Sequence, residues 1–84
     1  MQIILSPGAV NKLKRLPKPE TKKNLRKLHL FETDPLAGKP LEGKLKGIYS
    51  LRSWPYRILY RFLKDRHIIR IDVIDHRQGV YNKY

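Results

Sequence analysis

Three short segments in the second half of the chain alternate apolar with polar or charged residues. They span 48–52, 56–63 and 66–74, and two short connections join them, Ser53-Trp54-Pro55 and Lys64-Asp65. Such alternation is typical of strands with one buried face, and connections this short join antiparallel neighbours. The pattern therefore predicts an antiparallel meander, and no other feature of the sequence limits the fold as strongly.

The first half of the chain predicts one strand followed by a helical hairpin. Residues 2–5 are apolar and β-branched, and Ser6-Pro7 then supplies an N-cap and a favourable first helical residue. Apolar residues recur at helical spacing up to Leu16, and again between Pro19 and about Thr33. Each helix thus has one apolar face; its apolar positions are Ala9, Val10, Leu13 and Leu16 in the first helix and Leu25, Leu28 and Phe31 in the second.

Together these patterns predict a single α+β domain over residues 1–84. The expected order is β-α-α-β-β-β, with the helical hairpin packed on one face of an antiparallel sheet and a loop over 35–47. The pairing of the first strand stays open. Alternation assigns an inner, helix-facing set of Tyr49, Leu51, Ile58, Tyr60, Phe62, Ile69, Ile71 and Val73. The outer face then holds Ile48, Ser50, Arg52, Arg57, Leu59, Arg61, Arg70 and Asp72.

The charge of the chain points to a polyanionic partner. Nineteen Lys and Arg against seven Asp and Glu give a formal net charge of +12, and several guanidinium groups on one sheet face suit phosphate. Nucleic acid is the first expectation, ahead of a membrane surface or an acidic protein. No apolar stretch approaches the roughly 20 residues of a membrane span, and residues 1–5 lack the features of a signal peptide. We therefore expect a cytoplasmic protein without a membrane partner.

The composition argues against metal and cofactor chemistry. There is no cysteine, which excludes a disulfide, a zinc ribbon and a thiol nucleophile. The three histidines, His29, His67 and His76, do not have metal-ligand spacing. We expect neither a metal nor a cofactor.

Three motifs occur in a fixed order over about half of the chain. They are Leu41-x-Gly43-x-Leu45-x-Gly47-x-Tyr49-x-Leu51-Arg52, then Tyr56-Arg57-Ile58-Leu59-Tyr60, and last His76-Arg77-x-x-Val80-Tyr81. With the predicted element order, they resemble the RelE/ParE superfamily of bacterial and archaeal toxins. The resemblance implies a RelE-like fold and a cognate antitoxin as partner. The RelE branch cleaves messenger RNA on the ribosome, whereas the ParE branch poisons DNA gyrase.

The resemblance to RelE-type enzymes implies roles for individual residues. Arg57 and Arg77 match two arginines that contact the scissile phosphate, and Tyr81 matches a tyrosine that stacks on a base. The implied reaction needs no metal: a ribose 2′-hydroxyl attacks its adjacent phosphodiester. Two lysines of RelE have no direct counterpart, because Ile48 and Ser50 stand in their places.

The remaining site residues follow from charge and position. His76 or Tyr81 is a candidate general base, with alignment of the hydroxyl by ribosomal RNA as the alternative. The predicted RNA-binding residues are Arg52, Arg61, Lys44 and Lys46, the two lysines lying just upstream of the missing pair.

Less specific interpretations stay open at this point. Arg52 and Arg57 could form surface ion pairs with Asp72 or Asp75. Trp54 at the hairpin turn is expected to pack on neighbouring strands, although an exposed ring there could stack on a base or on an antitoxin side chain. At the level of function, a ParE-like gyrase inhibitor and an inactive relative that only binds RNA or its antitoxin are the alternatives to a nuclease.

Overall fold

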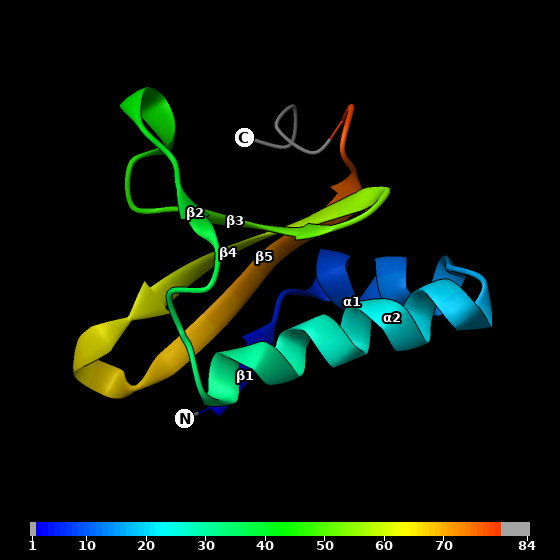
Figure 1. Cartoon of the computed structure of the whole chain (residues 1–84), viewed down its shortest axis with the longest axis horizontal. Helices are drawn as coiled ribbons and strands as arrows, with labels where there is room; N and C mark the ends of the chain where they lie inside the picture. Colours follow the sequence, from blue (N-terminus) through cyan, green and yellow to red (C-terminus); the bar gives the residue numbers. More distant parts are fainter. Residues whose placement is uncertain (1, 80–84) are drawn as a thin grey trace.

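The computed structural model describes residues 2–79 and contains two helices on one side of a five-stranded sheet (Figure 1). The helices are α1 (Pro7–Arg15) and α2 (Lys18–His29). The strands are β1 (Gln2–Leu5), β2 (Lys39–Pro40), β3 (Tyr49–Ser53), β4 (Tyr56–Leu63) and β5 (Ile68–His76). Single 3-10 turns follow α2 (η1, Leu30–Glu32), precede β3 (η2, Gly43–Leu45) and join β4 to β5 (η3, Lys64–Arg66). The predicted α+β class is confirmed.

The helical hairpin begins and ends where its capping residues require. The Ala9 N–H donates to Ser6 Oγ at 3.1 Å, which is the predicted N-cap, and α1 stops before Pro17. The second helix is shorter than predicted, because the chain tightens into η1 after His29 instead of continuing to Thr33. Leu25 was wrongly assigned to the buried face, since it is 43% exposed. Within residues 2–79, neither helix has the length and apolar character to cross a membrane.

The sheet has the strand order β1-β5-β4-β3-β2 and is mixed rather than wholly antiparallel. The predicted meander forms β3, β4 and β5, with β3 and β5 each shifted one or two residues towards the C-terminus. The first strand lies parallel to β5 at one edge, pairing Gln2 with Ile68 and Leu5 with Ile71. At the other edge, the segment predicted as a loop contains β2, which pairs antiparallel with β3.

A β-bulge in β5 changes which side chains reach the helices. Leu59 of β4 pairs with Val73, but the next residue, Tyr60, pairs with Ile71, so Asp72 is an extra residue on β5. Beyond the bulge the faces exchange. Ile74 joins the core between sheet and helices, while Val73, predicted to face the helices, packs in a second cluster on the outer face.

This outer cluster consists of Ile48 and Leu59, with Leu41, Leu45 and Val73 packed against them. The segment that contains η2 supplies Leu41 and Leu45, and it lies on the side of the sheet away from the helices (Figure 1). Gly43 is the first residue of η2 and Gly47 follows it; their φ angles are 66° and 95°, a conformation that side chains disfavour. The outer face is therefore partly covered rather than uniformly cationic.

Tyr60 is the centre of the main core. Its ring is fully buried, 4.4 Å from the Phe31 ring and 5.4 Å from the Tyr49 ring between centroids. Its hydroxyl donates to Pro35 O at 3.1 Å and accepts from the Gly38 N–H at 2.9 Å. Gly38 has no room for a side chain, because an added Cβ would lie 2.8 Å from the Tyr60 hydroxyl. Tyr60 thus fixes the segment between α2 and β2 onto the sheet.

We expect the replacement Tyr60→Phe to remove a sensitivity to alkaline pH. Burial raises the pKa of Tyr60 above its ordinary value of 10.0, against the smaller effect of the Gly38 N–H. The folded state therefore holds this proton more tightly than the unfolded state does. The contribution of the hydroxyl is complete below pH about 10 and declines as the pH rises through the folded pKa. Urea unfolding of both proteins at pH 8 to 11 checks this: their difference in unfolding free energy should shrink above pH about 10, and a constant difference would contradict the prediction.

Candidate functional site

Two arginines lie directly opposite each other on the outer face of the sheet. Arg52 on β3 and Arg57 on β4 are cross-strand partners, one pair away from the turn that joins these strands. Like charges in this arrangement repel and weaken strand pairing. An oxyanion between the two guanidinium groups would relieve this repulsion. We call Arg52, Arg57 and Arg77 the arginine site.

Arg57 lies between a hydroxyl group on β3 and a carboxylate residue on β5. Its Nη1 donates to Ser50 Oγ at 3.3 Å, and its cross-strand neighbour on the other side, on β5, is Asp75. Asp75 also forms an ion pair with Lys12 of α1 at 3.2 Å and accepts from the His76 N–H at 2.8 Å. One carboxylate therefore serves several cationic and N–H groups. The three arginines of the site therefore carry more positive charge than this shared carboxylate offsets, and the excess can attract an anionic ligand.

Arg77 reaches the same end of the sheet from the end of β5. Its N–H donates to Pro55 O at 2.9 Å, which ties it to the β3–β4 turn. Its guanidinium carbon lies 4.4 Å from the centroid of the Trp54 ring, a cation–π contact. The prediction that Trp54 packs on neighbouring strands was wrong: the residue is 56% exposed, and its contact is with Arg77.

His76 lies on the other face of the sheet from Arg57. Its cross-strand partner is Tyr56, and their rings meet edge to face with centroids 6.1 Å apart. Neighbouring residues of a strand point to opposite faces, so the Tyr56–His76 pair and the Arg57–Asp75 pair face opposite ways. His76 Nδ1 accepts from the Gln78 N–H at 3.4 Å. The structure thus brings Arg57 and Arg77 to one end of the sheet but turns His76 away from Arg57.

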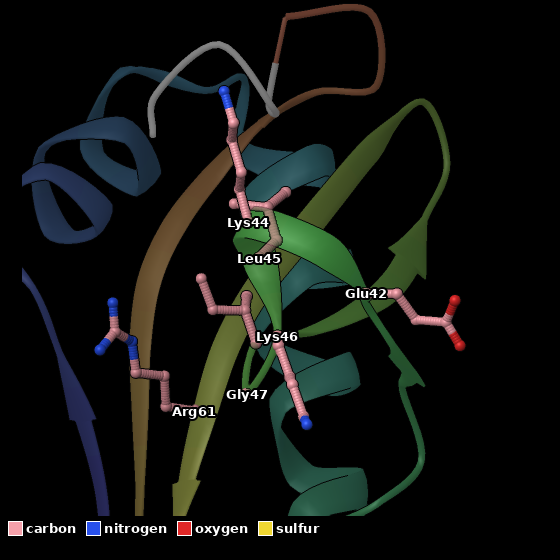
Figure 2. Close-up of a pocket in the computed structure, with 7 residues that line it drawn as sticks. Glu42, Lys44, Leu45, Lys46, Gly47 and Arg61 are labelled. Atoms are coloured by element: carbon pink, nitrogen blue, oxygen red, sulfur yellow. The ribbon is translucent and has the colours of Figure 1, made fainter.

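The other predicted RNA-binding residues surround a separate hollow of about 690 Å³ on the outer face. Lys44, Lys46 and Arg61 line it together with Glu42. Figure 2 shows the ends of these three cationic side chains pointing in different directions, not towards one shared point. This arrangement suits contact with an extended polyanion more than the grip of a single phosphate.

Asp72 partly neutralises the arginine at this hollow. Arg61 Nε lies 2.9 Å from Asp72 Oδ2, and Arg70 Nε lies 3.2 Å from Asp72 Oδ1. Arg61 and Arg70 are themselves cross-strand partners, so the bulged carboxylate relieves their repulsion. The two arginine pairs of the outer face therefore differ: Asp72 bridges this one internally, whereas the arginine site has the positive balance described above.

Two aromatic residues, Tyr81 and Trp54, were considered for contact with RNA. Tyr81 lies outside the described residues, so its predicted role stays a prediction. Trp54 was not among the predicted site residues, although its place at the middle of the predicted connection 53–55 was a usable signal. A side chain at the tip of such a turn has few strand neighbours to cover it.

A small cationic α+β domain with two arginines facing each other on its sheet suits a polyanionic ligand. Residues 3–81 match the family described as ParE toxin of type II toxin-antitoxin system, parDE. The chain therefore belongs to this family, within the RelE/ParE superfamily, and it is a toxin of the type II toxin–antitoxin class.

Individual relatives agree with this placement. Over 46 residues the chain is 39% identical to Toxin RelG of Mycobacterium tuberculosis, a stretch that is 55% of this chain and 53% of that protein. The matched stretch thus spans only about half the length of this curated relative. Among solved structures, the RelBE2 toxin–antitoxin complex of M. tuberculosis superposes with a TM-score of 0.82 at 29% identity, covering 90% of this chain and 96% of the other.

A more distant structure shares the fold alone. The RelBE complex of E. coli has a TM-score of 0.75 at 20% identity, covering 89% of this chain and 94% of that one. The predicted RelE-like fold is confirmed.

Proposed function

We propose that this toxin is a metal-independent endoribonuclease that cleaves messenger RNA on the ribosome and so inhibits translation. The observation that carries the proposal is the Arg52–Arg57 pair, held by Ser50 on an accessible sheet face. Such a pair suits a phosphodiester, and its strand positions make it more precise than a loop would. The 39% identity to Toxin RelG over part of the chain supports the same branch.

The reaction would be attack of a ribose 2′-hydroxyl on the adjacent phosphorus. The new bond from oxygen to phosphorus forms as the bond to the 5′-oxygen breaks, which leaves a cyclic phosphate and a 5′-hydroxyl end. Negative charge grows on the non-bridging oxygens in the transition state, and fixed guanidinium groups stabilise it. We assign this role to Arg57 and Arg77.

Proton transfer is not assigned to the arginines that stabilise charge. Since His76 faces away from Arg57, we propose that alignment of the 2′-hydroxyl by ribosomal RNA supplies most of the activation. Tyr81 would stack on a base near the cut. Lys44, Lys46 and Arg61 would contact the RNA backbone around it, in the cytoplasm where ribosomes are found.

The partner that silences the toxin would be a cognate antitoxin. The RelBE2 neighbour was solved as a toxin–antitoxin complex. On this chain we propose a small protein with an acidic, amphipathic segment, because it must cover cationic and apolar surface together. Leu25 of α2 and Leu30 of η1 are both 43% exposed and offer apolar surface for such contact.

Primer extension on messenger RNA in programmed ribosomes tests the nuclease. We expect discrete cuts when ribosomes are present and none on naked messenger RNA at the same salt concentration. The salt must be matched, because the charge of +12 makes all RNA binding salt-dependent. Absence of cuts with folded, antitoxin-free protein would refute the proposal.

A ParE-like inhibitor of DNA gyrase is the second candidate. Two observations favour it: the matching family is described by ParE toxins, and Ile48 and Ser50 stand where RelE carries lysines. Both side chains are buried against neighbouring residues, so neither position offers a proton-transfer group. This function predicts DNA breakage in the presence of gyrase, with messenger RNA left intact.

A further inference from the structure

We propose that the indole of Trp54, beside Arg77 of the arginine site, is a stacking platform for a nucleobase of single-stranded RNA. The inference rests on the proposed function, because it names the part of the substrate that meets the turn next to the arginine site. It assigns a role in RNA binding to a residue for which packing was the favoured expectation.

The exposure of Trp54 has no structural explanation in the turn itself. A large aromatic side chain is usually well covered, yet this residue is 56% exposed. The turn is nevertheless held from two sides: Lys23 of α2 donates to Trp54 O, and the Arg77 N–H donates to Pro55 O. The backbone is thus fixed while the ring is presented to solvent. A rigid, exposed ring is what a stacking surface requires.

The contact with Arg77 gives the platform a cationic partner. A guanidinium group 4.4 Å from the ring centroid leaves the rest of the indole open to a second planar group. Aromatic rings and guanidinium planes are the surfaces on which proteins stack unpaired RNA bases. A base on Trp54 would therefore lie next to a cation that can meet the backbone of the same strand.

The position of the turn fits one nucleotide step from the phosphate. The Ser53–Tyr56 pair closes the turn, and the next pair of the ladder is Arg52–Arg57. Adjacent residues along a strand are about 3.3 Å apart, so the pair of arginines lies close to the base of the turn. A phosphate between Arg52 and Arg57 would place a neighbouring base at the turn, within reach of Trp54.

Trp54 is the sole tryptophan of the chain, so intrinsic fluorescence reports on this turn alone. The test titrates native protein with a short oligouridine and, in parallel, with an abasic oligomer of the same length and charge. We expect the oligouridine to quench the fluorescence and the abasic oligomer to bind without comparable quenching. Equal quenching by both would overturn the inference, since it would show that phosphate contact alone changes the signal.

Variants separate stacking from charge. With Trp54→Ala the affinity for oligouridine should fall roughly 5- to 150-fold, the range for loss of one stacked base. The affinity for the abasic oligomer should stay within about twofold, and Trp54→Phe should restore most of the preference for oligouridine. If Trp54→Ala weakens both oligomers equally, Trp54 supports the fold or Arg77 but does not stack a base. Thermal unfolding of each variant controls for folding.

The binding test and the cleavage test fail independently. Oligouridine binding needs neither a ribosome nor a reaction. Selective quenching by a protein that makes no cuts would refute the nuclease and uphold stacking. The opposite result combines two findings: native protein and Trp54→Ala make ribosome-dependent cuts with the same half-saturating ribosome concentration, and native protein binds oligouridine no better than the abasic oligomer. That result would uphold the nuclease and refute stacking.

Discussion

Replacing Arg57 with alanine is expected to lower the rate of ribosome-dependent cleavage by about 10²–10³-fold, the usual loss for one transition-state donor. The fold should tolerate the change. Arg57 faces Arg52 across the strand pair, so its removal relieves a repulsion, and its polar contacts are partly exposed. We expect the free energy of unfolding to change by less than about 1 kcal/mol. Primer extension and urea unfolding on the same preparation measure both quantities.

Two further variants separate the effect of the Arg57 side chain from the effect of net charge. Arg66→Ala removes the same charge from an exposed position in η3, beyond the far end of β4, and should cleave at the native rate. Arg57→Lys keeps the charge but loses the planar fork, so its rate should fall between the native and alanine values. Equal loss of cleavage in Arg57→Ala and Arg66→Ala would mean that net charge, not the arginine site, governs the activity.

Replacing Tyr60 with alanine is expected to have the largest effect on stability. The change removes a fully buried ring that contacts Phe31 and Tyr49, and it leaves Pro35 O and the Gly38 N–H without their partner. Truncation of a buried aromatic ring costs about 3–5 kcal/mol. A domain of this length has a total stability of roughly 4–13 kcal/mol, so the change removes between about a quarter and all of it.

Thermal unfolding followed by circular dichroism measures the effect. A loss of this size lowers the Tm of a small domain by at least about 12 °C. Tyr49→Ala is the matched control, because this ring stacks on Tyr60 but is only half-buried, and its loss should cost clearly less. Equal destabilisation by the two changes would contradict the central place given to Tyr60.

Local patterns predicted most of the elements because each depends on a few neighbouring residues. The Ser6 cap, the stop at Pro17 and the alternation of β4 are all encoded within a turn or a strand. The errors share a different cause. The second helix tightens after His29 where Phe31 packs under the Tyr60 ring, and a short edge strand at Lys39–Pro40 exists because β3 is there to pair with it.

In the candidate site, too, local patterns predicted some features and missed others. The placement of Arg52, Arg57 and Arg61 on the outer face followed from the period of two alone. Three other features could not be predicted in this way. They are the neutralisation of Arg61 by the bulged Asp72, the position of His76 on the face away from Arg57, and the different directions of Lys44 and Lys46. These features depend on strand register and on the path of a covering segment, which single-strand patterns do not contain.

The sequence by itself therefore determined the order of the two helices and the four longer strands, the core face of β3 and β4, and the arginines of the outer face, because periodicity and charge are local properties. Only the tertiary structure decided the parallel pairing of β1 with β5, the bulge that turns Val73 outward, and the contact of Arg77 with Trp54. Each of these joins residues distant in the chain, and their pairing is set by how the whole core packs.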